Sequence, residues 1–521
     1  MMLWSHDRVP RTMSTQHPDN ARAPYWCRRE VIQGEDEVYE AFFAFSELKC
    51  NEVMWDSEGK DVDTHVVRKL LSSQPDFFRE HVLGQDLFLT YRVPNPKIEA
   101  AERKTVAETL LNVAVGYDVA STFYGKEVAP IFEVILPFTT SWEEVVGLHQ
   151  YYKALVSHVE IAKTKLAEWM GWFNPREVNV IPLIEDKESL LSVDSIVAPY
   201  VKKIGSRRIR VFIARSDPAL NYGLACAVVL AKIALSKMKK LEVEEGIEIY
   251  PIIGVGSLPF RGHLSPRNLQ GFMNEYRGVY TVTVQSALKY DYALEETQRT
   301  VDELNRKLPN GEAVELEVEE NLLQTLEKLK SAYEEEVERL APLINAVALY
   351  VPPRRARRLH IGLFGYSRGV RGVRLPRAIP FTCALYSLGI PPEFIGLRAL
   401  TDLNEAEWRT LRQGYLNMIN DLREAAGYVS YRNLDLLQEE AGRLVKKVSM
   451  SEENLKKIFE LFLDSLKVVE ENLNVKLGPK TYSEKRHENT VNNFLLAFLE
   501  GDSEAAKRYL LEAAIIRRSL G

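Results

Sequence analysis

Short apolar runs rich in Val, Ile and Leu recur along the chain, and helical segments lie between most of them. Several runs are almost continuously apolar, as expected for strands that are buried on both faces. This strand–helix alternation predicts an α/β fold, a (β/α)₈ TIM-like barrel, with a doubly wound open sheet as the alternative. The predicted strands are residues 51–55, 86–91, 131–138, 178–184, 209–214, 249–255, 279–284 and 359–364.

Two parts of the chain depart from this alternation. Residues 291–347 carry two amphipathic helical patterns separated at LPNG (308–311), which predicts a helical hairpin inserted before the eighth strand. After Pro380 almost all of the sequence has a helical pattern. We therefore expect a catalytic barrel over residues 1–380, including the insertion, and a helical C-terminal region over 381–521 that packs on it.

Charge and composition narrow the range of partners. A formal net charge of -6 argues against nucleic acid as the main partner. The chain has no apolar run of membrane-spanning length and no signal-peptide pattern at its start. Its 4 cysteines form no CxxC pair, which fits a reducing compartment. We expect a cytoplasmic globular protein without a nucleic-acid or membrane partner.

Two carboxylates close consecutive predicted strands. Glu185 follows VIPLI, and Asp217 follows the strand that ends in FIA. Because adjacent strands of a barrel end side by side, both side chains can reach one ion. Carboxylates without a neighbouring histidine or cysteine favour Mg²⁺ or Mn²⁺. A purely structural alternative remains open, in which each carboxylate caps the helix that follows.

Basic residues form a second set of candidates. In TMSTQHPDN, Pro18 biases His17 toward an extended backbone, and histidine readily exchanges protons near neutral pH. Several arginines meeting at one barrel mouth would indicate a polyanionic substrate. The basic run PPRRARRLH (352–360) is interpreted as a solvated connector rather than a phosphate site. The candidate arginines are Arg92, Arg261, Arg368 and Arg377.

The segment GYSRG (365–369) matches the nucleophile elbow of serine hydrolases. Asp402 or Asp435, followed by His487, would complete a triad in the required chain order. An elbow should lead directly into a helix, however, and the segment after it is rich in Gly, Pro and Arg. A serine hydrolase that uses Ser367 is therefore a remote alternative.

Several motifs together resemble the phosphoenolpyruvate carboxylase family, in particular its short archaeal type. TMSTQHPDN resembles the histidine motif TAHPTE, and LPRAIPF (375–381) is close to the arginine motif LRAIPW. VIPLIED and ARSDPALNYG resemble the stretches that carry the metal carboxylates, and MWDSEGKD (54–61) falls where the family has a Gly/Asp-rich loop. The motifs also follow the family's order from His17 onward.

The resemblance implies carboxylation of phosphoenolpyruvate with bicarbonate to oxaloacetate and phosphate, through carboxyphosphate and a metal-stabilised pyruvate enolate. It implies that His17 is catalytic and that Glu185 and Asp217 bind Mg²⁺ or Mn²⁺. It also implies a cytoplasmic homotetramer, a dimer of dimers. The arginines that would bind the substrate are Arg92, Arg261, Arg368 and Arg377, and the last three would also be catalytic.

Some family residues are missing. Leu220 stands where larger family members have a lysine, and Pro259 where they have a second histidine, for which His263 is a candidate replacement. Ser519 replaces an asparagine that helps to bind aspartate, so inhibition by aspartate does not follow from the resemblance. The alternatives are another Mg-dependent barrel enzyme of enolate chemistry, pyruvate kinase-like or an aldolase/lyase, and a non-enzymatic helical scaffold.

Overall fold

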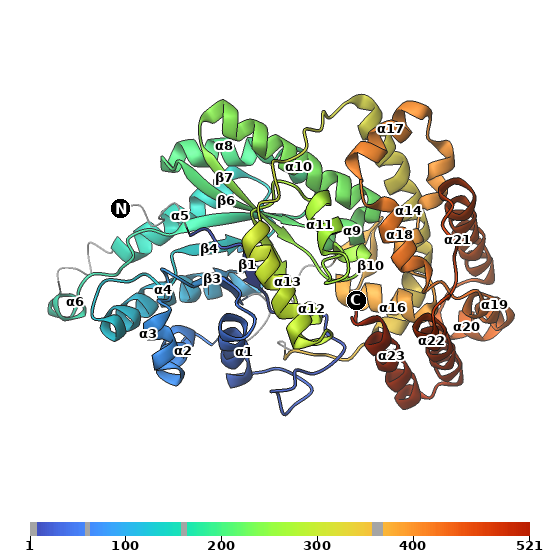
Figure 1. Cartoon of the computed structure of the whole chain (residues 1–521), viewed down its shortest axis with the longest axis horizontal. Coiled ribbons are helices and arrows are strands. Elements are labelled where there is room, and N and C mark those ends of the chain that lie inside the picture. Colours follow the sequence, from blue (N-terminus) through green and yellow to red (C-terminus); the bar gives the residue numbers. More distant parts are fainter. Residues whose placement is uncertain (1–7, 58–62, 158–163, 357–367) are drawn as a thin grey trace.

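Eight parallel strands close into a barrel at the centre of the molecule (Figure 1). The computed structural model describes residues 8–57, 63–157, 164–356 and 368–521. The barrel confirms the predicted (β/α)₈ architecture and excludes the open sheet. Its strands are β1 (Thr12–Ser14), β2 (Glu52–Asp56), β3 (Phe88–Arg92), β4 (Glu133–Leu136), β5 (Asn179–Ile184), β6 (Arg208–Ala214), β7 (Glu248–Gly254) and β8 (Thr281–Val284).

The barrel begins with a strand that the sequence did not predict. β1 is three residues long and pairs with both β2 and β8, so it closes the ring. The run 359–364, predicted as the eighth strand, lies outside the described residues, and the barrel closes without it. The position assigned to the eighth strand was therefore wrong.

Helices surround the barrel between and after its strands. They are α1 (Glu35–Ser46), α2 (Val66–Ser73), α3 (Pro75–Glu80), α4 (Arg103–Tyr124), α5 (Trp142–Ser157), α6 (Lys165–Met170), α7 (Lys187–Leu191), α8 (Val193–Ile204), α9 (Ser216–Tyr222), α10 (Leu224–Glu245), α11 (Leu269–Glu275), α12 (Ser286–Tyr290) and α13 (Leu294–Lys307). Among the described helices, none combines the length and apolar composition that crossing a lipid bilayer requires.

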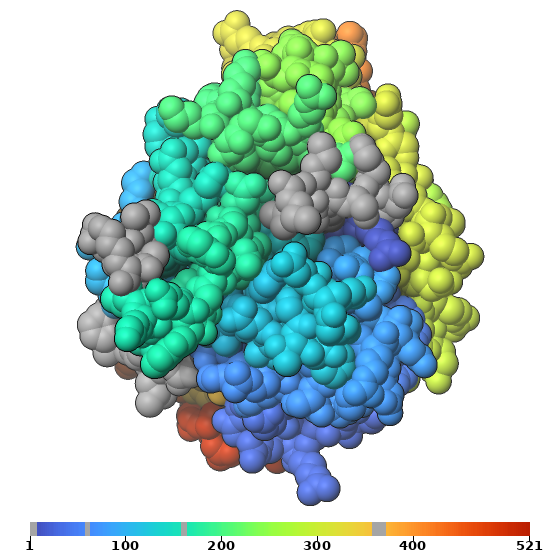
Figure 2. Space-filling view, turned by 90° about the vertical axis from the view of Figure 1, so that its left-hand side faces the viewer, coloured from blue at the N-terminus to red at the C-terminus, as the bar shows by residue number. Residues whose placement is uncertain are grey.

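A helical region covers one side of the barrel, at the right of Figure 1. From the opposite side, Figure 2 shows mainly blue to green residues, with orange and red ones only at the margins. A short antiparallel pair, β9 (Arg368–Val370) and β10 (Val373–Leu375), leads into this region. Its helices are α14 (Glu320–Ala348), α16 (Ala378–Leu388), α17 (Glu405–Gly414), α18 (Met418–Ala426), α19 (Tyr431–Glu439), α20 (Ala441–Val448), α21 (Glu452–Leu473), α22 (Tyr482–Glu500) and α23 (Ser503–Arg517).

The two helices predicted at 291–347 do form, but they follow the last barrel strand instead of preceding it. They also separate: α13 packs beside β1, whereas α14 packs against α16, α17 and α21. Hence α13 completes the barrel, and α14 belongs with the helical region. The domain boundary near residue 380 stays a prediction.

Helix α10 joins the two parts because it is apolar around most of its circumference. It contacts β6 and β7 on one side and α14 and α17 on the other, and most of its residues are buried. Gly246, with a φ of 63°, ends the helix in a left-handed conformation that glycine adopts without strain. A helix buried on all sides is expected when it lies between two packed layers.

Candidate active site

A cavity of about 360 Å³ opens at the carboxyl ends of the strands, where barrel enzymes carry their catalytic groups. Six arginines but only two carboxylates are among its lining residues, so its wall is positively charged. Six residues predicted from the sequence line it: His17, Arg92, Glu185, Asp217, Arg261 and Arg377. Three arginines that the sequence did not single out also line it: Arg215, Arg354 and Arg355.

His17 lies on the loop that leaves β1, and this loop is held by neighbouring elements. The ring atom Nδ1 is 2.9 Å from Oγ1 of Thr15. The side chain of Gln16 accepts a hydrogen bond from the backbone N–H of Asp56 at 3.1 Å. Asp19 accepts one from the N–H of Ala287 at 2.7 Å. The histidine is therefore presented from a backbone that is fixed on both sides of it.

Asp291 anchors the end of the same loop. Its two carboxylate oxygens accept hydrogen bonds from the N–H groups of Ala21 and Arg22, both at 2.7 Å. Burial raises the pKa of Asp291 to about 7, although these two hydrogen bonds oppose the rise. Burial also raises the pKa of Asp19, against the effect of Arg261.

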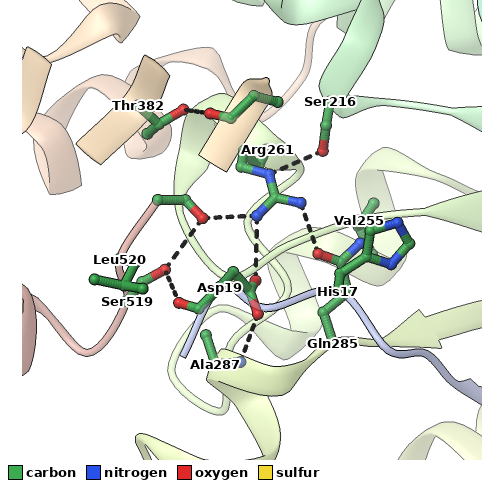
Figure 3. Close-up of polar contacts among 12 residues, drawn as sticks. His17, Asp19, Ser216, Val255, Arg261, Gln285, Ala287, Thr382, Ser519 and Leu520 are labelled. Atoms are coloured by element: carbon green, nitrogen blue, oxygen red, sulfur yellow. Dashed lines mark hydrogen bonds and ion pairs between the residues drawn. The ribbon is translucent and has the colours of Figure 1, made fainter. Parts of the chain in front are cut away.

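Arg261 lies at the centre of Figure 3, surrounded by groups from distant parts of the chain. Its Nε donates to Oγ of Ser216 at 3.0 Å, and Nη2 donates to Oε1 of Gln285 at 2.7 Å. Its Nη1 donates to the backbone oxygen of Gly521 at 2.6 Å and lies 3.3 Å from Oδ2 of Asp19. The side chain is 2% exposed. Arg261 is thus a fixed positive charge in the cavity wall, unlike a mobile surface arginine.

Arg92 is fixed in a similar way. Its Nε and Nη2 donate to the two carboxylate oxygens of Asp56, at 3.0 and 2.6 Å, in a buried bidentate pair. Arg377 directly precedes α16 and also lines the cavity. Arginine residues from both the barrel and the helical region therefore line the cavity.

The two carboxylates predicted to bind a metal both line the cavity. Glu185 follows β5, and its Oε2 accepts a hydrogen bond from the N–H of Phe138 at 2.9 Å. Phe138 has a φ of 52°, rare for an aromatic residue, and its turn directs that N–H at the carboxylate. Asp217 lies in the first turn of α9. Two carboxylates, with water and substrate oxygens, form a donor set that suits Mg²⁺.

No group of three or more His, Cys, Asp and Glu side chains that could hold a metal occurs within the described ranges. Binding of a divalent cation at this site would therefore depend on Glu185 and Asp217 among the described side chains, with the remaining ligands supplied by water and substrate.

The interpretation of PPRRARRLH as a solvated connector was wrong for its described part. Val351 to Arg355 line the cavity, and Arg354 and Arg355 are only 3% and 2% exposed. Arg355 donates to Glu37 at 3.0 Å and to Glu40 at 2.6 Å. Burial alone would raise the pKa of Glu40, but Arg355 and Lys289 lower it to about 2. The sequence did not reveal this burial because the carboxylates that pair with Arg355 lie on α1, more than 300 residues earlier in the chain.

Four other predicted positions lie away from the cavity lining or outside the described side chains. Arg368 begins β9 and pairs in register with Leu375, but its side chain lies outside the described part of the structure. Ser367 of the hydrolase alternative is also outside it, and His487 is fully buried in α22 beside Arg517, away from the cavity. His263 is hydrogen bonded to Asp421 at 2.6 Å and does not line the cavity either.

The fold and the cavity define a (β/α)₈-barrel protein with an anion-attracting site at the catalytic end. A family model described as "Phosphoenolpyruvate carboxylase" matches residues 9–521. The chain is 47% identical to the phosphoenolpyruvate carboxylase of Metallosphaera sedula over 98% of its length and 99% of that protein. Proteins of the same name from Caldivirga maquilingensis and Picrophilus torridus are 46% and 43% identical, with 98% of this chain and 99% of each relative covered. The chain belongs to the phosphoenolpyruvate carboxylase family, an enzyme family.

Proposed function

We propose that this chain carboxylates phosphoenolpyruvate with bicarbonate, giving oxaloacetate and phosphate. The observation that carries the proposal is the meeting of His17, three of the predicted arginines and two carboxylates in one positively charged cavity. Phosphoenolpyruvate carries a phosphate and a carboxylate, and planar guanidinium groups bind both. Arg92, Arg261 and Arg377 would bind these groups, together with Arg368 as the resemblance implies.

The reaction begins when a bicarbonate oxygen attacks phosphorus and the bond from phosphorus to the enol oxygen breaks. The products of this step are carboxyphosphate and the enolate of pyruvate. The arginines neutralise charge on the phosphoryl group during transfer, and their fixed placement lowers the barrier. Mg²⁺ or Mn²⁺, held by Glu185 and Asp217, would supply positive charge near the oxygen that loses the phosphoryl group.

His17 acts in the second step. It accepts the proton of the carboxyl group of carboxyphosphate and passes it to a phosphate oxygen as the bond from carbon to the bridging oxygen breaks. The carbon of the released CO₂ then bonds to the methylene carbon of the enolate. Water must be kept from the cavity, since protonation of that carbon would give pyruvate.

A coupled assay tests the proposal. The protein is supplied with phosphoenolpyruvate, and oxaloacetate is followed by malate dehydrogenase, with and without bicarbonate and with a chelator before Mg²⁺ or Mn²⁺ is restored. We expect oxaloacetate only when both bicarbonate and the cation are present. Pyruvate formation that does not depend on bicarbonate would favour a pyruvate kinase-like or lyase reaction.

We further propose that the protein is a cytoplasmic homotetramer. Sedimentation analysis tests the number of subunits.

A further inference from the structure

The ring of His17 contacts the hydroxyl group of Thr15, a side chain that can both donate and accept a hydrogen bond. Oγ1 of Thr15 lies 2.9 Å from Nδ1 of His17, and Thr15 is fully buried. The chemistry of His17 at Nδ1 therefore depends on what a hydroxyl can donate or accept.

Thr15 is held rigidly from two sides. Its N–H donates to the carbonyl oxygen of Val284 at 3.1 Å, and its own carbonyl accepts from Nζ of Lys289 at 2.8 Å. Lys289 also donates to Oγ of Ser14 at 3.2 Å and to Glu40 at 2.9 Å, so its three protons are all used. A buried ammonium thus fixes the backbone from which the hydroxyl projects.

A hydroxyl can donate one hydrogen bond and accept two. When Nδ1 carries a proton, Oγ1 of Thr15 accepts it, and when Nδ1 carries a lone pair, the hydroxyl donates to it. A carboxylate or carbonyl could only accept and would fix one tautomer. Thr15 therefore keeps Nδ1 bonded whichever ring nitrogen carries the proton.

We propose that Thr15 is a positioning residue that orients the His17 ring and keeps Nδ1 hydrogen bonded while Nε2 exchanges a proton with the reacting group. This inference rests on the proposed function. In the carboxyphosphate step, Nε2 takes the carboxyl proton, Nδ1–H donates to Thr15, and Nε2 then returns the proton to phosphate. No proton is gained or lost by Thr15.

The test compares Thr15→Val with Thr15→Ser. Valine has nearly the shape of threonine without its hydroxyl, and serine keeps the hydroxyl. We expect Thr15→Val to lower kcat for oxaloacetate about tenfold or more with little change in the KM for phosphoenolpyruvate, and to increase the share of pyruvate. We expect Thr15→Ser to restore kcat to within about threefold of the original protein. A change in KM alone, or equal kcat in both variants, would overturn the inference.

A spectroscopic measurement separates this inference from the proposed function. In protein labelled with ¹⁵N only at histidine, the Nδ1 signal of His17 is identified by its loss in His17→Asn. Solid-state spectra should show that signal shifted in Thr15→Val and retained in Thr15→Ser. An unchanged signal in Thr15→Val would overturn the inference even if carboxylation is observed. If Thr15→Val does not fold, Thr15→Ala replaces it, and the same shift of the Nδ1 signal is expected. A chain that shows the shift but makes no oxaloacetate would contradict only the proposed function.

Discussion

The two ends of the barrel both contain buried arginine–carboxylate contacts, but they use them differently. At the amino ends of the strands, Arg210 donates to Glu52 at 2.8 and 2.7 Å and to Glu133 at 3.0 Å. Thr90 also donates to Glu52, and all of these side chains are nearly inaccessible. Burial alone would lower the pKa of Arg210, but the two carboxylates raise it above its usual value.

At the carboxyl ends, arginines outnumber carboxylates around the cavity. Arg92 and Arg261 are positioned by Asp56 and Asp19, yet both still border a space that a ligand can enter. Between the two ends, a layer of apolar side chains separates the charged groups: Met13, Met54, Ile135, Ile181, Leu183, Phe212, Ala214 and Ile252. The same type of ion pair is therefore sealed inside the barrel at one end and lines the cavity of the candidate site at the other.

The largest effect, a loss of stability, is expected for a substitution at the amino ends of the strands. Arg210→Met leaves Glu52 and Glu133 buried without their cation, so the free energy of unfolding should fall by about 3–5 kcal/mol. Chemical denaturation measures this loss, and kcat of the folded protein should be unchanged. Arg208→Met is the control, since its partner Glu248 is partly exposed and the loss of stability should be smaller than in Arg210→Met. Equal losses in the two variants would contradict the structural role of Arg210.

At the carboxyl ends of the strands, His17→Asn should reduce oxaloacetate formation about 10³-fold, because it removes the group proposed to transfer the proton. Binding of phosphoenolpyruvate, measured by calorimetry, should persist, and pyruvate should become a larger share of the product. His65→Asn, an exposed histidine at the start of α2, is the control. Near-normal carboxylation by His17→Asn would remove His17 from the mechanism.

Arg377→Ala should lower kcat/KM about 10²-fold with little change in thermal stability, because it removes a proposed donor to the transferring phosphoryl group. Arg374→Ala is the matched control, since Arg374 is exposed on β10 and does not line the cavity. If both variants lost activity equally, a general effect of positive charge would replace the specific role of Arg377.

Glu185→Gln and Asp217→Asn should each raise the Mg²⁺ concentration for half-maximal activity at least about tenfold, since even outer partners of metal ligands change affinity by that much. A Mg²⁺ titration of activity measures the change. Glu188→Gln, an exposed residue in the first turn of α7, is the control. Unchanged titrations in both ligand variants would show that the ion binds elsewhere.

The smallest effect concerns pH. The pKa of Asp291 is raised to about 7, so the native state holds a proton that the unfolded chain has already lost, and stability falls as the pH rises toward 7. Between pH 6 and pH 7 this group should account for a loss of about 1 kcal/mol. Denaturation at the two pH values should show a smaller loss in Asp291→Asn. An identical loss in that variant would contradict the assignment.

The barrel was predictable because strands such as β6 and β7 are long apolar runs that can be recognised without knowledge of their pairing partners. β1 was not, because its three residues, Thr12 to Ser14, gain their strand character only by pairing with β2 and β8. The sequence pointed to Glu185 and Asp217 because each follows a recognisable strand, and to His17 because it directly precedes Pro18 in a family motif. Arg354 and Arg355 were misread because burial among α1 side chains depends on packing between distant segments, which charge patterns do not reveal.

The short first strand also has a consequence for how the protein acquires its site. β1 can complete its pairing only after β8 has formed, although some 270 residues separate the two along the chain. Contacts of such long range form late, because the entropy of a large loop must first be overcome. We therefore expect His17, the proposed proton-transfer group, to reach its place late in folding, so that a partly assembled barrel would have its arginines and acids without this histidine.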